Sequence, residues 1–187
     1  MEDILNILEL NPIIGAVRNE KDVEVVVKSN IEVVFILFGN LLSIKRISDY
    51  IKSWGKKVCI HIDLIEGLGK DPAAVDFIKE NVKPDGIITT KVTLAKRSKQ
   101  VGIFTILRLF IIDSHSLVTG IKNVHETGPD AVEVMPGIAG KLVEKIRDQI
   151  NVPVIAGGLI TTKDDIIEAL SEGVLAVSTS CNELWNM

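Results

Sequence analysis

The sequence has few cysteines, few aromatic residues and no long apolar run. Its 187 residues include 2 cysteines, and aromatic residues make up 4% of the chain. Cys59 and Cys181 lie far apart and outside any CxxC or Cys/His spacing, so neither a disulfide framework nor a metal site is expected. The apolar runs are much shorter than the roughly 20 residues of a membrane-spanning helix, and no charged-then-apolar leader opens the chain. We therefore expect a soluble cytoplasmic protein with no membrane partner, metal or cofactor.

One part of the chain lacks acidic residues. The net charge is −4, but residues 33 to 112 hold 13 Lys and Arg against 7 Asp and Glu, and no acidic residue lies between Asp85 and Asp113. A basic run of this kind is usually a solvated helix face, but it can also be a surface for a polyanion. The candidate nucleic-acid contacts in this interval are Lys91, Lys96, Arg97 and Lys99. The segment "IKRISDYIKSWGKK" is the next candidate.

Eight short apolar runs follow one another at even spacing. They are "PIIGAVR", "VVFILFG", "KVCIHID", "GIITT", "FTILRLF", "AVEVMPG", "VPVIAGG" and "LAVSTS", which begin at residues 12, 33, 57, 86, 104, 131, 152 and 175. Amphipathic helical patterns separate them, with start signals at Asp71-Pro72 and at Thr162. Strand and helix therefore alternate throughout, and no linker marks a second domain. This pattern predicts that residues 1–187 form one compact (β/α)₈ barrel of the TIM type.

The main rival to the barrel is an open, doubly wound sheet. Such folds often carry a glycine-rich dinucleotide-binding turn after the first strand, and "GAVRNEKD" has no such fingerprint. We therefore favour the closed barrel.

Side chains alternate between the two faces of a strand, so the alternation predicts which of them reach the barrel axis. In "KVCIHID", the apolar set that begins at Val58 should face the helices, which directs Cys59, His61 and Asp63 inward. The same alternation directs seven more residues inward near the carboxyl ends of their strands: Arg18, Thr90, Arg108, Glu133, Gly158, Ser178 and Ser180. Charged groups of both signs therefore meet at one mouth, either as a ligand site or as a salt-bridge network that only satisfies buried charges.

The last two strands end in residues suited to an anion. Glycines 157 and 158 allow backbone N–H groups to approach an anion without an intervening Cβ, and Ser178, Thr179 and Ser180 supply hydroxyl or amide donors. Ser180 and Glu183 have the spacing of a capping box, which predicts a short final helix from Cys181. In barrels of this type a phosphate often lies at this place. We therefore predict a phosphate site here, with Arg108 or Arg18 as its charge partner.

Seven segments resemble the glycerol-3-phosphate-responsive antiterminators of glycerol uptake operons. They are "HIDLIEGL", "DPAAVDFI", "PDGIITTK", "RLFIIDSHSL", "PDAVEVMPG", "VIAGGLI" and "AVSTSCNELW", which span nearly the whole chain in order. The resemblance implies a barrel that binds glycerol 3-phosphate and acts on leader mRNA to prevent transcription termination. The polar residues expected around the ligand hydroxyls are then His61, Asp63, Glu133 and Thr90.

Two other functions stay open from the sequence. A phosphate-binding barrel can be an enzyme that acts on a small phosphorylated metabolite, with His61, Asp63 and Glu133 as acid, base or metal ligands. However, a Schiff-base aldolase needs an inward lysine, and the predicted inward set contains none. The chain can also be a metabolite sensor that acts through a protein partner. We expect a regulator without catalytic residues, of unknown oligomeric state.

Overall fold

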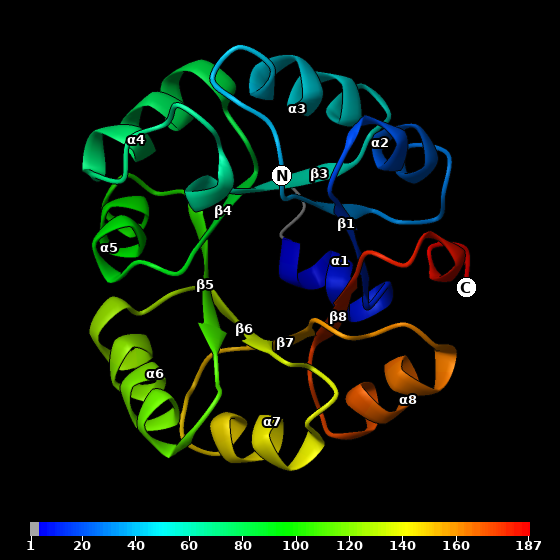
Figure 1. The fold of residues 1–187 in the computed structure, drawn as a ribbon, viewed down its shortest axis with the longest axis vertical. Helices are drawn as coiled ribbons and strands as arrows, with labels where there is room; N and C mark the ends of the chain where they lie inside the picture. The colour runs from blue at the N-terminus through cyan, green and yellow to red at the C-terminus, as the bar shows by residue number, and fades with distance from the viewer. Residues whose placement is uncertain (1–3) are drawn as a thin grey trace.

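Eight parallel strands close into a barrel in chain order (Figure 1). A computed structural model describes residues 4–187. The strands are β1 (Ile13–Val17), β2 (Val33–Ile36), β3 (Lys57–His61), β4 (Gly86–Thr89), β5 (Phe104–Phe110), β6 (Ala131–Met135), β7 (Val154–Gly157) and β8 (Ala176–Thr179). The register closes the ring where Ile14 of β1 is paired with Val33 of β2 on one side and Ser178 of β8 on the other. The predicted (β/α)₈ barrel is therefore confirmed.

Helices cover the outside of the barrel in Figure 1. They are α2 (Glu20–Val26), α3 (Ile44–Ser53), α4 (Pro72–Phe77), α5 (Val92–Gln100), α6 (Ser114–Thr127), α7 (Gly140–Arg147) and α8 (Lys163–Ser171). Three shorter helical segments complete the chain: η1 (Ile62–Leu64), η2 (Ile78–Val82) and η3 (Asn182–Leu184). No helix in the described part of the chain is long and apolar enough to cross a bilayer.

The predicted helix starts at Asp71 and Thr162 are confirmed. The side chain of Asp71 accepts a hydrogen bond from the backbone N–H of Ala73, and Pro72 is the first residue of α4. Thr162 and Asp165 form a reciprocal capping box at the start of α8. Both caps satisfy N–H groups that have no partner within the helix.

Buried apolar side chains form two layers, one between the strands and the helices and one inside the barrel. On β3, Val58 and Ile60 belong to the outer layer and Cys59 to the inner one, as the alternation predicts. Helix α1 (Ile4–Leu10) was not predicted, and its buried residues belong to the inner layer. It covers the barrel interior at the end where the strands begin, and the predicted mouth lies at the opposite end.

The predicted capping box of Ser180 and Glu183 is wrong. The final helical element, η3, is a three-residue 3₁₀ turn that begins at Asn182, and no side chain caps it. The hydroxyl of Thr179 instead accepts the backbone N–H of Cys181 at 3.0 Å. The buried indole of Trp185 donates to the Thr179 carbonyl oxygen at 3.0 Å, and this contact fixes the C-terminal turn against the barrel.

Candidate ligand site at the mouth of the barrel

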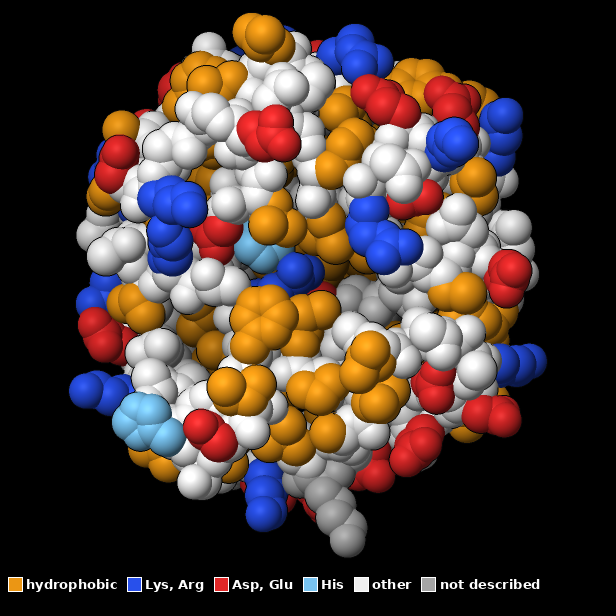
Figure 2. Space-filling view, viewed as in Figure 1, with side chains coloured by type: hydrophobic (Ala, Val, Ile, Leu, Met, Phe, Trp, Pro, Cys, Tyr) orange, Lys and Arg blue, Asp and Glu red, His pale blue; other side chains and the backbone are white. Residues whose placement is uncertain are grey.

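A cavity of about 520 Å³ opens at the carboxyl ends of the strands. Figure 2 looks into this mouth: basic groups and a histidine lie at the centre of the hollow, and apolar side chains gather on one side of it. The cavity is lined by residues of the β1, β2, β5, β6, β7 and β8 ends: Ala16, Arg18, Leu37, Arg108, Met135, Gly158, Leu159, Ile160, Thr161, Ser178, Thr179, Ser180 and Cys181. Six of the predicted site residues therefore meet in one cavity, although they come from widely separated parts of the chain.

Arg108 and Glu133 form a buried ion pair at the base of this cavity. They lie on neighbouring strands in direct register, and Arg108 Nε donates to Glu133 Oε2 at 2.6 Å. The other carboxylate oxygen, Oε1, accepts from Ser178 Oγ at 2.6 Å. Arg108 is 5% exposed and Glu133 is fully buried. Within residues 4–187, no protein acceptor binds the two Nη groups of Arg108, so they are available to a ligand.

His61 lies buried at the end of β3 with an unpartnered ring nitrogen. Its Nδ1 has no hydrogen-bond partner, although the side chain is 3% exposed. Burial and the nearby Arg108 charge lower the pKa of His61 to about 4, against a smaller opposing effect of Asp63. The imidazole is therefore neutral at neutral pH. A neutral imidazole can exchange hydrogen bonds with a hydroxyl without adding charge to the site.

Asp63 is held by the threonines that follow β4. Its carboxylate accepts from Thr89 Oγ1 at 2.7 Å and from both the backbone N–H and the Oγ1 of Thr90 at 2.8 Å. Asp63 lies in the η1 turn, outside the main cavity. Thr90 lines a smaller hollow of about 240 Å³ that also reaches Arg108. Sequence reasoning gave Thr89 no role, but its buried hydroxyl fixes this carboxylate.

The prediction that Gly158 faces the barrel axis is wrong, because Gly157 occupies that position. Ile155 belongs to the inner apolar layer, so the alternation on β7 puts Gly157 on the same face. A Cβ on Gly157 would lie 2.5 Å from Glu133 Oε1 and 2.6 Å from Ser178 Oγ. The strand ends at this residue, and Gly158 begins the following turn with φ +78°. Gly157 therefore makes room for the buried hydrogen bond, and Gly158 allows the turn.

The hydroxyls at the end of β8 and just after it have different roles. Thr179 Oγ1 donates to the Ile160 carbonyl oxygen at 2.8 Å, so this side chain ties the β7 and β8 loops together. Ser178 donates to Glu133. Among residues 4–187, the Ser180 hydroxyl and the backbone N–H groups of Gly158 and Ser180 have no protein partner. These groups line the cavity with Arg18, whose exposed guanidinium also has no protein acceptor in that range.

Three of the four predicted nucleic-acid contacts are paired within the chain. Lys96 binds Glu126 at 2.6 Å, Arg97 binds Asp76 at 2.8 Å, and Lys99 binds Asp130. In the described residues Lys91 makes no ion pair. The face that lacks acidic residues in the sequence is therefore largely neutralised in three dimensions.

The cavity also contains residues that sequence reasoning missed. Leu37, Met135, Leu159, Thr161 and Cys181 line it. All five lie at a strand end or within four residues after one, and this position was the signal in the sequence that could have found them. Across residues 4–187, no group of three His, Cys, Asp or Glu side chains is placed to hold a metal ion.

Comparison with known proteins identifies the family. The family model described as glycerol-3-phosphate responsive antiterminator matches residues 13–185. The chain belongs to this family. The chain also resembles the crystal structure of a glycerol uptake operon antiterminator regulatory protein from Listeria monocytogenes, with 36% identity, a TM-score of 0.90 and coverage of 92% of this chain and 94% of that one.

Two further solved structures show how far the likeness extends. A glycerol uptake operon antiterminator-related protein from Thermotoga maritima is 35% identical, with a TM-score of 0.83 over 94% of this chain and 98% of that one. A deoxyribose phosphate aldolase from Aeropyrum pernix is 16% identical, with a TM-score of 0.70 over 98% and 95% of the two chains. The aldolase shares the barrel fold alone.

Proposed function

We propose that the protein binds glycerol 3-phosphate at the carboxyl-terminal mouth of the barrel and, with this ligand, acts on leader mRNA to prevent transcription termination. The observation that carries the ligand proposal is the state of Arg108. Its guanidinium is almost fully buried, is held on one side by Glu133, and has two Nη groups without a protein acceptor in the described chain. A buried fork of donors with free positions suits an anion that accepts two hydrogen bonds at once, as a phosphate does.

The phosphate lies between the two arginines and the turns after β7 and β8. Arg108 supplies the base of the site and Arg18 its outer wall. The free amides of Gly158 and Ser180, with the Ser180 hydroxyl, supply further donors from the turns after β7 and β8. Donors from several rigid strand ends bind an anion with little loss of conformational freedom. Gly157 and Thr179 support this arrangement through packing and loop hydrogen bonds.

The glycerol hydroxyls extend from the phosphate toward His61, Asp63 and Thr90. The unpartnered Nδ1 of His61 is buried beside Arg108, and a hydroxyl there would supply its missing hydrogen bond. Asp63 and Thr90 lie on the same side of Arg108, where the smaller hollow opens. Glu133 is fully buried and acts by holding Arg108 and Ser178 in place.

The role is regulatory rather than catalytic. The described lining of the mouth cavity contains no lysine, which Schiff-base chemistry needs. Action on RNA is a proposal that rests on the family. The α5 cations Lys91, Lys96, Arg97 and Lys99 stay the surface predicted from the sequence, although three of them would have to exchange an internal carboxylate for an RNA phosphate.

Calorimetric titration with glycerol 3-phosphate, glycerol and inorganic phosphate tests the ligand proposal. We expect glycerol 3-phosphate to bind most tightly and glycerol not to bind measurably. Arg18→Gln and Arg108→Lys should each weaken binding by about tenfold or more, because a hydrogen bond to a charged group contributes about 1.5–3 kcal/mol. Arg108→Lys keeps the positive charge next to Glu133, so the fold should survive.

Arg46→Gln is the matched control, because Arg46 is an exposed α3 residue paired with Glu20 at 2.7 Å, away from the mouth cavity. It should bind glycerol 3-phosphate like the wild type. If Arg18→Gln and Arg108→Lys bind glycerol 3-phosphate as tightly as Arg46→Gln does, the ligand binds elsewhere. Leader mRNA binding measured with and without glycerol 3-phosphate tests the second half of the proposal, which fails if the ligand changes neither the affinity nor the termination frequency.

A further inference from the structure

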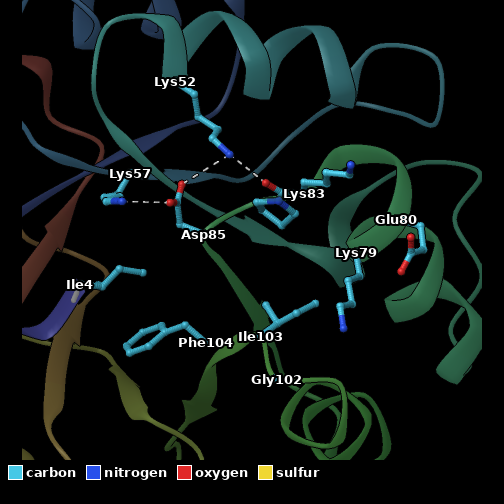
Figure 3. Close-up of a pocket in the computed structure, with 11 residues that line it drawn as sticks. Ile4, Lys52, Lys57, Lys79, Glu80, Lys83, Asp85, Gly102, Ile103 and Phe104 are labelled. Carbon is cyan, nitrogen blue, oxygen red and sulfur yellow. Dashed lines mark hydrogen bonds and ion pairs between the residues drawn. The ribbon is translucent and has the colours of Figure 1, made fainter. Parts of the chain in front are cut away.

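A second large pocket lies at the opposite end of the barrel, where the strands begin. Its volume is about 650 Å³. We call it the lysine pocket, and its lining comprises Ile4, Lys52, Lys57, Lys79, Glu80, Lys83, Pro84, Asp85, Gly102, Ile103 and Phe104. The lining comes from α1, the end of α3, the starts of β3 and β5, the η2 turn, and the segments that lead from η2 to β4 and from α5 to β5 (Figure 3). This pocket is separate from the mouth cavity.

Positive charge in the lysine pocket exceeds the carboxylates available to it. Lys52 and Lys57 share one carboxylate, that of Asp85, at 4.0 and 3.3 Å. Lys79 donates to the backbone carbonyl of Val101 at 2.6 Å and has no acidic partner among residues 4–187. The exposed Lys83 has none in that range either. The pocket therefore has four ammonium groups and two carboxylates, whereas each of three α5 cations has a carboxylate of its own.

The other side of the pocket is apolar. Figure 3 shows Ile4, Ile103 and Phe104 along this side, away from Asp85 and its two lysines. Ile4 and Ile103 are buried, while Phe104 is only half-buried, so part of its ring borders the pocket. An aromatic ring next to several cations is the combination by which proteins bind single-stranded nucleic acid: the base contacts the ring and the phosphates contact the cations.

We propose that the lysine pocket binds a nucleotide of single-stranded RNA, with the base against Phe104 and the flanking phosphates on Lys79 and Lys83. The identity of the polymer as RNA rests on the proposed function; the location and the mode of binding rest on this pocket. Single-stranded rather than double-stranded RNA fits, because stacking on Phe104 needs an unstacked base, which a single strand offers and a double helix does not. RNA and glycerol 3-phosphate therefore occupy opposite ends of the barrel.

Fluorescence polarisation with a labelled, mixed-sequence single-stranded 12-nucleotide RNA tests the proposal. Lys79→Gln combined with Lys83→Gln should weaken binding at least tenfold. The slope of log K against log salt should become shallower by about 1.4. Two phosphate contacts are lost, and each contact to a single strand contributes about 0.7 to this slope. Phe104→Leu should weaken binding about fivefold or more without changing this slope, because it removes stacking and no charge.

Lys122→Gln combined with Lys145→Gln is the matched control, because it removes two exposed positive charges from α6 and α7, which do not line the lysine pocket. It should leave the affinity and the salt slope almost unchanged. The proposal is overturned if this pair weakens RNA binding as much as the pocket pair does, if double-stranded RNA binds equally well, or if only a mononucleotide and no oligonucleotide binds. Titration of the same variants with glycerol 3-phosphate measures binding at the mouth. A loss of RNA binding can therefore be distinguished from a loss of glycerol 3-phosphate binding.

Discussion

Arg108 and Glu133 form a buried ion pair at the base of the mouth cavity. Burying an ion pair costs more desolvation energy than an apolar pair of the same size, so such a pair is weak evidence for stability alone. Here Glu133 uses one oxygen for Arg108 Nε and the other for Ser178. The Nη groups, which could have completed a bidentate pair, are left without a protein acceptor in the described chain. The proposed ligand site depends on these unused donors, because a pair that only neutralised the charge would have no need to leave them free.

His61 should make the stability of the protein depend on pH. Its pKa is about 4 in the folded state, below the ordinary value of 6.5, so between these values the unfolded chain binds a proton that the folded protein excludes. The free energy of unfolding therefore falls as the pH falls from 6.5 towards 4, and His61 contributes no pH dependence above that window. Urea unfolding at pH 7 and pH 4.5 should show that wild type loses roughly 2–3 kcal/mol more than His61→Gln does. Identical losses would mean that the imidazole is not buried in its neutral form.

At the scale of elements, the junction of β6, β7 and β8 depends on a glycine. In Gly157→Ala, the new methyl group would overlap Glu133 Oε1 and Ser178 Oγ, so the buried hydrogen bond must lengthen. Overpacking of this kind costs about 1–3 kcal/mol of stability. The variant should also bind glycerol 3-phosphate more weakly, because Glu133 holds Arg108.

Gly158→Ala is the comparison for this prediction. Its φ of +78° strains any other residue, but the added methyl would meet only the flexible end of Met135, at 3.1 Å. Chemical denaturation and ligand titration should therefore show a smaller effect on ligand affinity than in Gly157→Ala. If the two alanine variants lose ligand affinity equally, the Glu133 hydrogen bond is not the important contact.

The sequence predicted each strand of the barrel because each is a short apolar run with turn-forming residues after it. It also located most of the mouth, since strand ends in a parallel barrel meet at one edge. Sequence reasoning did not find contacts between residues that lie far apart in the sequence. The carboxylates that pair with Lys96, Arg97 and Lys99 lie 30, 21 and 31 residues away, on other elements. The inward position predicted for Gly158 was also wrong, because Ile155 lies on the inner face of β7 and the alternation from it reaches Gly157.

Different groups close the two ends of the barrel interior. The charged layer of Arg108 and Glu133 closes the interior below the mouth, and α1 closes it at the other end with Ile4, Ile7 and Leu8. Both proposed sites lie just outside these closures. Strands β3 and β5 run from the lysine pocket, at Lys57 and Phe104, to the mouth, so a ligand that shifts these strands acts on both ends. Any such coupling requires that the ligand bind two states with different affinity.

Helix α1 should contribute much of the stability of the barrel through Leu8, which is fully buried in the inner apolar layer. Leu8→Ala should lower the free energy of unfolding by about 2–5 kcal/mol, because it removes buried methyl groups and leaves a cavity that the closed ring of strands cannot fill. Leu10→Ala, in the same helix, is the control: Leu10 is 86% exposed, so its replacement should change stability by no more than about 0.5 kcal/mol. Urea unfolding measures both values. Glycerol 3-phosphate affinity should be unchanged in both variants, because α1 lies at the end of the barrel away from the mouth. Equal stability of the two variants would show that the barrel interior holds together without the helix, and that α1 is only an appendage to the strands.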